Sequence, residues 1–308
     1  MSLVINTTTP EGIVIAADSR QSYRNRIGVS RIGSDNAQKL FQINDRIGVG
    51  ITGLAFIVDN GVLKNVSLFI DEFIENNEVN DMDVLEVAKK MHEKYISVYN
   101  IDEQFKNLQA NIQRDLTQQG AKNIKFNKQD NILQFTFERN GKVENGNAGI
   151  EQINFLVAGF NKDKTHEVYI CYLPGDIQKK RDSQTPGIEY GASWLGQTDL
   201  VSRIILGFDP RMGNLQSINQ LIGQIGPDRF NQEIRNLEYS IQWGTMTLQD
   251  GVDFSDLMIK TTSAIQRFSD GIAAEPGDMP GVGGEVDIAI ITKKDGFKWV
   301  NKKNIRYH

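Results

Sequence analysis

The chain contains a single cysteine, Cys171, and only three histidines among its 308 residues. One cysteine excludes an intramolecular disulfide framework and is typical of proteins in a reducing compartment. The first apolar run, Leu3 to Ile5, is too short for a signal peptide, and no segment reaches membrane-spanning length. These absences predict a soluble, cytoplasmic protein with no membrane contact.

The scarcity of histidine narrows the chemistry further. His92 precedes a glutamate as in zinc-protease motifs, but the second histidine of such motifs is missing, so we expect no metal. No G-x-S-x-G motif is present, which argues against a Ser-His-Asp triad. The glycine-rich run 281–284 precedes a strand instead of opening a helix, so we expect no nucleotide cofactor. The net charge is −5 without a basic stripe, which gives no support for nucleic-acid binding.

The first fifty residues have the pattern of β-structure. Val4 to Thr9 and Ile13 to Asp18 flank the turn residues Pro10-Glu11-Gly12 and predict a hairpin at the start of the chain. A second strand pair is predicted at Lys39 to Ile43 and Arg46 to Thr52. Apolar residues at helical spacing then predict one helix from Gly53 to about Asn76 and another from about Asp81 to Tyr99.

The rest of the chain groups its helices and strands. Residues from about 101 to 150 are polar and carry an Asn140-Gly141 turn signal, which predicts an inserted helix and hairpin. Further predicted strands span 153–160 and 167–173, and a closing hairpin spans 286–300. Predicted helices begin after Thr198 and after Asp250, with extra helical segments at about 210–245, broken at Gly226-Pro227. Grouped helices and strands predict a layered α+β architecture in one domain, residues 1–308.

The opening hairpin brings the start of the chain beside a carboxylate. If the turn centres on Pro10-Glu11, residues whose numbers sum to about 21 face each other, so Asp18 lies beside Leu3 and Ser2 occupies the next rung. Methionine aminopeptidase normally removes a methionine that precedes a small residue. Ser2 would then be the first residue, although Met-Ser-Leu could also replace a native start that carries threonine.

A serine at the N-terminus has its own base. The α-amine has an ordinary pKa of about 7.7–8.0, so it can be neutral near physiological pH and accept the hydroxyl proton. A nearby lysine would favour the neutral amine and stabilise the developing alkoxide, and an aspartate would hold that lysine. A backbone N–H at a tight turn would complete the site as an oxyanion donor.

Several segments resemble proteasome β-type subunits of the N-terminal-nucleophile (Ntn) hydrolase superfamily. They are TTPEGIVIAADSR from Thr8 to Arg20, KLFQI from Lys39, GVGITGL from Gly48 to Leu54, and the run from Gly283 to Gly296. The resemblance implies a four-layer αββα sandwich and a threonine-type peptidase. It aligns Ser2 with the catalytic threonine, Asp18 and Lys39 with its acidic and basic partners, Gly53 with the oxyanion glycine, and Ser22 with a substrate-groove residue.

The sequence departs from the family around this centre. Two supporting serines of the family align with Gln197 and Val282, and the supporting aspartate has two candidates, Asp270 and Asp278. Our leading hypothesis is peptide-bond hydrolysis through an acyl-enzyme. The resemblance implies a homo-oligomeric ring, peptide or unfolded-protein substrates and an ATP-dependent unfoldase. A catalytically silent assembly subunit of the same fold and an Ntn acylase acting on small amides remain alternatives.

Overall fold

The structure, a computed structural model, describes residues 2–24, 30–59, 61–272, 275–276 and 280–304. Five antiparallel strands form its first large sheet, in the order β15-β1-β2-β18-β19. These strands are β1 (Leu3–Thr9), β2 (Gly12–Ala17), β15 (Gly191–Gly196), β18 (Asp287–Thr292) and β19 (Gly296–Asn301). Every residue of β1 and β2 is buried, so this hairpin lies at the centre of the molecule.

A second antiparallel sheet of five strands has the order β14-β13-β12-β6-β5. Its strands are β5 (Leu40–Asn44), β6 (Ile47–Gly53), β12 (Ile153–Phe160), β13 (His166–Leu173) and β14 (Ile177–Asp182). The predicted pairing of β5 with β6 is confirmed, with each strand displaced by about one residue. The two sheets share an apolar core to which each contributes β-branched and leucine side chains, among them Val4, Ile15, Leu156 and Ile170.

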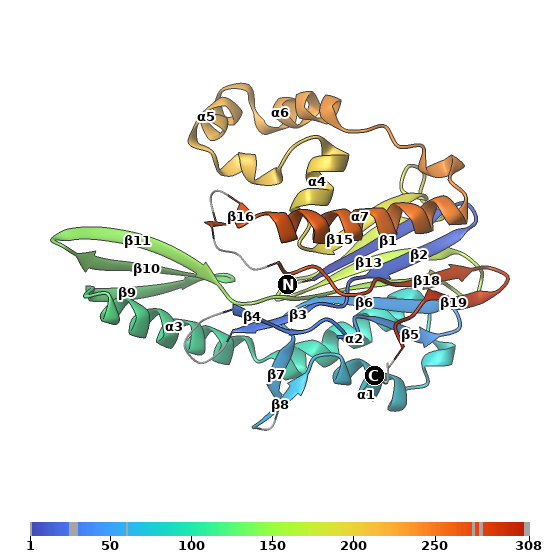
Figure 1. The fold of residues 1–308 in the computed structure, drawn as a ribbon, viewed down its shortest axis with the longest axis horizontal. Coiled ribbons are helices and arrows are strands. Elements are labelled where there is room, and N and C mark those ends of the chain that lie inside the picture. Colours follow the sequence, from blue (N-terminus) through green and yellow to red (C-terminus); the bar gives the residue numbers. More distant parts are fainter. Residues whose placement is uncertain (1, 25–29, 60, 273–274, 277–279, 305–308) are drawn as a thin grey trace.

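Helices cover the outer face of each sheet. The helices α4 (Asp199–Leu206) and α7 (Leu248–Phe268) pack with β1, β2 and β18 around a core that includes Val14 and Ile259. On the other side, α1 (Leu68–Glu75) and α2 (Val84–Tyr99) lie against the second sheet. Figure 1 shows these two pairs of helices on opposite sides of the strands. The predicted mixed α+β class is confirmed.

The region predicted as a helix with a hairpin contains α3 (Ile101–Gln118) and a three-stranded sheet of β9 (Lys122–Gln129), β10 (Ile132–Arg139) and β11 (Lys142–Gly149). Leu116, Ala121 and Phe137 form a small core between helix and sheet. The Asn140-Gly141 turn joins β10 to β11 with positive φ at both residues, as the sequence predicts. Figure 1 shows this region projecting from the main body.

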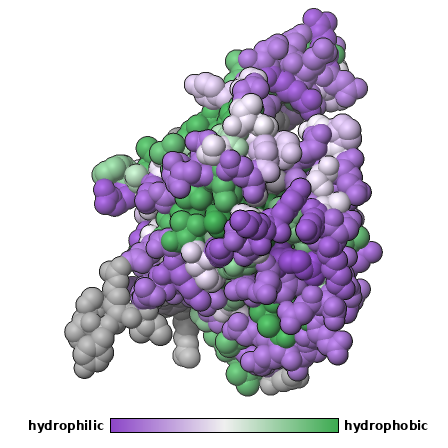
Figure 2. All heavy atoms as spheres, turned by 90° about the vertical axis from the view of Figure 1, so that its right-hand side faces the viewer, coloured by the Kyte–Doolittle hydropathy of each residue, from purple (hydrophilic) through white to green (hydrophobic). Residues whose placement is uncertain are grey.

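The predicted break at Gly226-Pro227 is confirmed, because α5 (Gln216–Ile225) ends there and α6 (Pro227–Ile234) begins. The described chain also contains short elements: η1 (Val79–Asp81), η2 (Pro210–Asn214), η3 (Arg235–Leu237), η4 (Trp243–Thr245), β16 (Gly271–Ile272) and β17 (Glu275–Pro276). None of the helices in the described part is long and apolar enough to cross a membrane. Figure 2 shows one end of the molecule, where hydrophilic side chains predominate around smaller apolar areas.

The helix predicted from Gly53 to about Asn76 is wrong over most of its length. Gly53 ends β6, and the hairpin of β7 (Phe56–Asp59) and β8 (Val62–Asn65) follows before α1 begins. The segment contains an Asn-Gly pair, a strong hairpin signal, and here this signal prevails over the helical spacing of the apolar residues. A second hairpin, β3 (Gln21–Arg24) with β4 (Ser30–Ser34), also has no counterpart among the predicted elements.

Candidate active site

The opening hairpin has the predicted register. Val4 pairs with Ala17, and the pairing continues to Leu3 and Asp18. The Leu3 N–H donates to Oδ1 of Asp18 at 2.9 Å, and the Asp18 N–H donates to the Leu3 carbonyl at 3.2 Å. Asp18 is therefore fixed at the end of the hairpin, opposite Leu3, the residue that follows Ser2 in the chain.

Ser2 is held by the end of β15. The Gln197 N–H donates to the Ser2 carbonyl oxygen at 2.7 Å, and only 5% of Ser2 is exposed. Gly196 has a φ of +93°, and a Cβ atom at this position would lie 1.9 Å from the same carbonyl oxygen. The backbone of β15 can therefore approach Ser2 this closely only because residue 196 is glycine.

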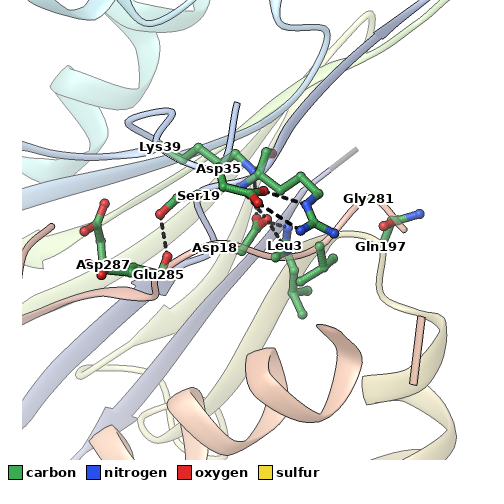
Figure 3. A network of polar contacts seen from close by, with 12 residues as sticks. Leu3, Asp18, Ser19, Asp35, Lys39, Gln197, Gly281, Glu285 and Asp287 are labelled. Carbon is green, nitrogen blue, oxygen red and sulfur yellow. Dashed lines mark hydrogen bonds and ion pairs between the residues drawn. The ribbon is translucent and has the colours of Figure 1, made fainter. Parts of the chain in front are cut away.

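A buried ion pair lies next to this segment (Figure 3). Lys39 Nζ donates to Asp18 Oδ1 at 2.8 Å, and the exposed fractions of the two residues are 5% and 1%. The same ammonium donates to the Arg20 carbonyl oxygen. Burial lowers the pKa of Lys39 below its ordinary 10.5, and the charge of Asp18 partly opposes this change.

The other oxygen of Asp18 is also fully engaged. Oδ2 accepts from the Arg20 N–H at 3.1 Å and from the Gly283 N–H at 3.0 Å. With the Leu3 N–H and the Lys39 ammonium on Oδ1, four donors converge on one carboxylate. Such a carboxylate provides a rigid negative partner that keeps the Lys39 ammonium in place.

Gly53 ends β6 in a conformation that suits glycine. Its φ is +101°, and a Cβ atom there would lie 2.0 Å from the Gln152 carbonyl oxygen. The Leu54 N–H donates to that carbonyl at 2.8 Å, which pins the turn after Gly53 against β12. The backbone of Gly53 lines a small cavity that Ser2 and Lys39 also line, and because residue 53 is glycine, it adds no side chain of its own there.

Most of the predicted site residues line two adjoining cavities. A small one of about 40 Å³ is lined by Ser2, Ser22, Lys39 and Gly53, among others. It adjoins an open groove of about 1040 Å³ that is also lined by Ser2, Ser22 and Gly53, and by Gln197. The structure thus brings together Ser2, Lys39, Gly53 and Ser22, with Asp18 bonded directly to Lys39.

The two candidate supporting aspartates do not join this group. Asp270 follows α7 and is exposed, and no hydrogen bond among the described residues links it to Ser2, Asp18 or Lys39. Asp278 lies outside the described residues. Sequence reasoning missed the Gly283 N–H as a support of Asp18, and it missed Gln266, whose side chain bonds that of Gln197 at 2.9 Å. No sequence signal singled out Gln266, because a glutamine on an amphipathic helix usually faces solvent.

In the part of the chain that the structure describes, no cluster of three or more His, Cys, Asp or Glu side chains could hold a metal ion. The polar groups at the site are one buried ammonium, one carboxylate, hydroxyl groups, amides and backbone N–H groups. This set can hold a proton and stabilise a negative charge.

No protein-family model and no curated protein matches the chain. Solved structures similar to it include Anbu (ancestral beta-subunit) from Yersinia bercovieri, with 12% identity, a TM-score of 0.48, and coverage of 98% of this chain and 88% of that one. Another is the Anbu (Gly-1) mutant from Hyphomicrobium sp. strain MC1, with 12% identity, a TM-score of 0.48, and coverage of 98% and 86%. The expected identification as a 20S proteasome β-type subunit is wrong: the two structures named above are Anbu proteins, and neither is a 20S β-type subunit.

Proposed function

We propose that this chain is an N-terminal-nucleophile hydrolase that cleaves amide bonds in peptides once Ser2 is its first residue. The observation that carries the proposal is the buried pair of Lys39 and Asp18, which ends at the same small cavity as Ser2. In this proposal the two large sheets and their covering helices form a four-layer αββα sandwich. Residues 1–308 make one domain, with an insertion at about 101–150 and extra helices at about 210–245.

The reaction begins at Ser2. Its neutral α-amine takes the hydroxyl proton while Oγ attacks the carbonyl carbon of the scissile amide. The Lys39 ammonium favours the neutral form of the amine and stabilises negative charge on Oγ, and Asp18 keeps Lys39 in place. The Gly53 N–H donates to the oxyanion of the tetrahedral intermediate.

Collapse of this intermediate breaks the C–N bond, and the α-ammonium of Ser2 returns its proton to the leaving amine. The acyl group is then an ester on Oγ of Ser2. Water, activated by the same amine, attacks the ester carbonyl and releases the acid, which restores the serine hydroxyl.

The size of the groove favours a peptide over a small amide. A volume of about 1040 Å³ lies at the upper end of small-molecule sites, and the groove is open along the surface. Ser22, on β3, lines both the groove and the small cavity, so it is placed to contact a bound chain. In a homo-oligomeric ring, such a site would face an enclosed chamber, and an ATP-dependent unfoldase would deliver unfolded substrates to it. Size-exclusion chromatography measures whether the chain forms such an assembly.

The deciding experiment is the intact mass before and after exposure to a peptide epoxyketone. This electrophile reacts with a hydroxyl and an amine on the same terminal residue, so it reports an N-terminal nucleophile directly. We expect loss of methionine and one adduct in the parent. A Ser2→Thr variant should also form the adduct, and a Ser2→Ala variant should not.

A catalytically silent subunit of the same fold is the second candidate. Two observations favour it. Gln197, whose backbone N–H holds Ser2, occupies a position where the resemblance implies a supporting serine. Asp270, a candidate for the supporting aspartate, is exposed. A retained methionine with no adduct on the parent would reject the hydrolase proposal in favour of this one.

A further inference from the structure

Gln266, on α7, bridges the two segments that hold the candidate nucleophile and its ion pair. Its Nε2 donates to Oε1 of Gln197 at 2.9 Å. Its Oε1 accepts from the Gly281 N–H at 3.0 Å and from the Val282 N–H at 2.9 Å. Figure 3 draws Gln197 and Gly281, the two ends of this bridge, with the network around Asp18.

The bridge has a fixed polarity. Two backbone N–H groups can bond only to an acceptor, so the oxygen of the Gln266 amide faces residues 281 and 282 and its NH₂ group faces Gln197. Gln197 must therefore present its own oxygen to Gln266. A residue that only donates or only accepts cannot satisfy both sides of this arrangement at once.

Each end of the bridge continues to a residue of the site. On one side, the Gln197 N–H donates to the Ser2 carbonyl oxygen at 2.7 Å. On the other side, Val282 is followed by Gly283, whose N–H donates to Asp18 Oδ2 at 3.0 Å and whose carbonyl accepts from the Ser19 N–H at 2.9 Å. The segment 281–283 is buried, so water does not offer these groups substitute partners.

We propose that Gln266 is a positioning residue that fixes Ser2, through Gln197, relative to Asp18, through the segment 281–283. This proposal rests on the proposed hydrolase function, and it names a residue that acts without touching the substrate. Gln266 lines a separate cavity of about 660 Å³ between α4 and α7 and is not among the residues that line the substrate groove. Gln197 borders both spaces.

Loss of the bridge should therefore slow the chemical step more than it weakens substrate binding. A displacement of about 1 Å between reacting groups can cost on the order of 100-fold in rate. For Gln266→Leu, which keeps the approximate volume, we expect kcat on a fluorogenic peptide amide to fall by about 10-fold or more. KM should stay within about twofold, because Gln266 itself does not line the groove that binds the substrate.

Two further variants test the route of the effect. Gln197→Glu keeps an acceptor for Gln266 Nε2 and should retain more activity than Gln197→Leu, which removes it. The double variant Gln197→Leu with Gln266→Leu should be no slower than the slower single variant, because both remove the same link. Gln249→Leu is the matched control, since Gln249 is exposed on α7 and, among the described residues, its side chain bonds that of Asp253 at 2.8 Å; the kcat of this variant should not change.

Hydrogen exchange gives a readout that does not depend on activity. In Gln266→Leu, the amides of Gly281 and Val282 lose their acceptor and must exchange faster. The proposal requires in addition faster exchange at the Gln197 N–H and the Gly283 N–H, which Gln266 does not contact.

The outcomes separate the two proposals. An inert parent whose Gln266→Leu variant shows faster exchange at Gln197 and Gly283 would remove the hydrolase function and keep the positioning role. An active parent whose Gln266→Leu variant has unchanged kcat, or unchanged exchange at both amides, would overturn the positioning role alone. Equal losses in Gln249→Leu would also overturn it.

Discussion

The Lys39 ammonium and the Asp18 carboxylate meet at 2.8 Å in a place where only 7% of the lysine side chain and none of the aspartate side chain reach solvent. A pair this deeply buried lacks water to solvate either charge if its partner is removed. It therefore couples the stability of the fold to the chemistry that we propose for Ser2, and variants of the pair must separate these two effects.

We predict that Lys39→Ala destabilises the protein by about 3–5 kcal/mol, because it leaves a buried carboxylate without its counter-charge. The double variant Asp18→Asn with Lys39→Met removes both charges and should recover part of that loss in urea unfolding; the rest remains because the new amide NH₂ faces a backbone N–H that donates to Asp18 in the parent. Neither variant should form the epoxyketone adduct at the parental rate. If Lys39→Ala forms it as fast as the parent, the role assigned to Lys39 is wrong.

The pH dependence of kcat/KM should be bell-shaped. Activity requires the neutral α-amine, and the Lys39 ammonium favours that neutral form, so the acid limb should lie below the ordinary α-amine pKa of about 7.7–8.0. Activity also requires the Lys39 ammonium, and burial lowers the pKa of Lys39, so the alkaline limb should lie below 10.5. Asp18 opposes this lowering, whereas Arg20 and Lys303 add to it.

Asp18→Asn should consequently move the alkaline limb to still lower pH, and Lys303→Met should move it upward. Lys303 is a useful comparison because it bonds Asp287 and not Asp18. Initial rates with a peptide amide between pH 6 and 11 would measure both limbs. An alkaline limb that stays in place in both variants would mean that Lys39 does not titrate in the reaction.

The hairpin at the start of the chain illustrates what the sequence can predict. Its register depends on local turn chemistry at Pro10-Glu11-Gly12 and on alternation over a few residues, and both are visible in the sequence. The register brings Asp18 to Leu3 as predicted. Lys39 was indicated by the resemblance of the KLFQI segment to proteasome β-type subunits and not by local geometry, and the structure places its ammonium 2.8 Å from Asp18.

Gln266 and Gly283 show where that reasoning ends. The Gly283 N–H reaches Asp18 across 265 positions in the chain, and Gln266 bonds Gln197 across 69. Neither contact leaves a local pattern, because the residues meet only after α7 has packed on the first sheet. The β7–β8 hairpin, by contrast, does have a local signal, the Asn-Gly pair. The apolar residues of the same segment also fit helical spacing, and this second pattern predicts the wrong element.

The close approach at Gly196 gives a sharp test of how Ser2 is placed. Gly196→Ala would put a Cβ atom 1.9 Å from the Ser2 carbonyl oxygen at a φ of +93°, so we expect Ser2 to be displaced and adduct formation to be lost. Gly223→Ala is the matched control, because a Cβ atom there meets nothing within 4 Å. Gly223 lies in the last turn of α5, where replacing glycine by alanine should stabilise the protein by up to about 1 kcal/mol.

Intact-mass measurement of adduct formation and urea unfolding would check both glycine variants. Full adduct formation in Gly196→Ala would show that Ser2 need not lie where β15 holds it. A loss in Gly223→Ala equal to that in Gly196→Ala would attribute the effect to general destabilisation.

Cys171 should be inert in the folded protein. It is fully buried on β13 and its thiol bonds the Ala88 carbonyl oxygen at 3.8 Å, and burial raises the pKa of this thiol well above its ordinary value. The thiolate is the reactive species, so a thiol reagent at pH 8 should modify Cys171 only after urea unfolding. Because the chain has one cysteine, mass spectrometry reads the result directly. Rapid modification without urea would mean that the packing of α2 on the second sheet opens in solution.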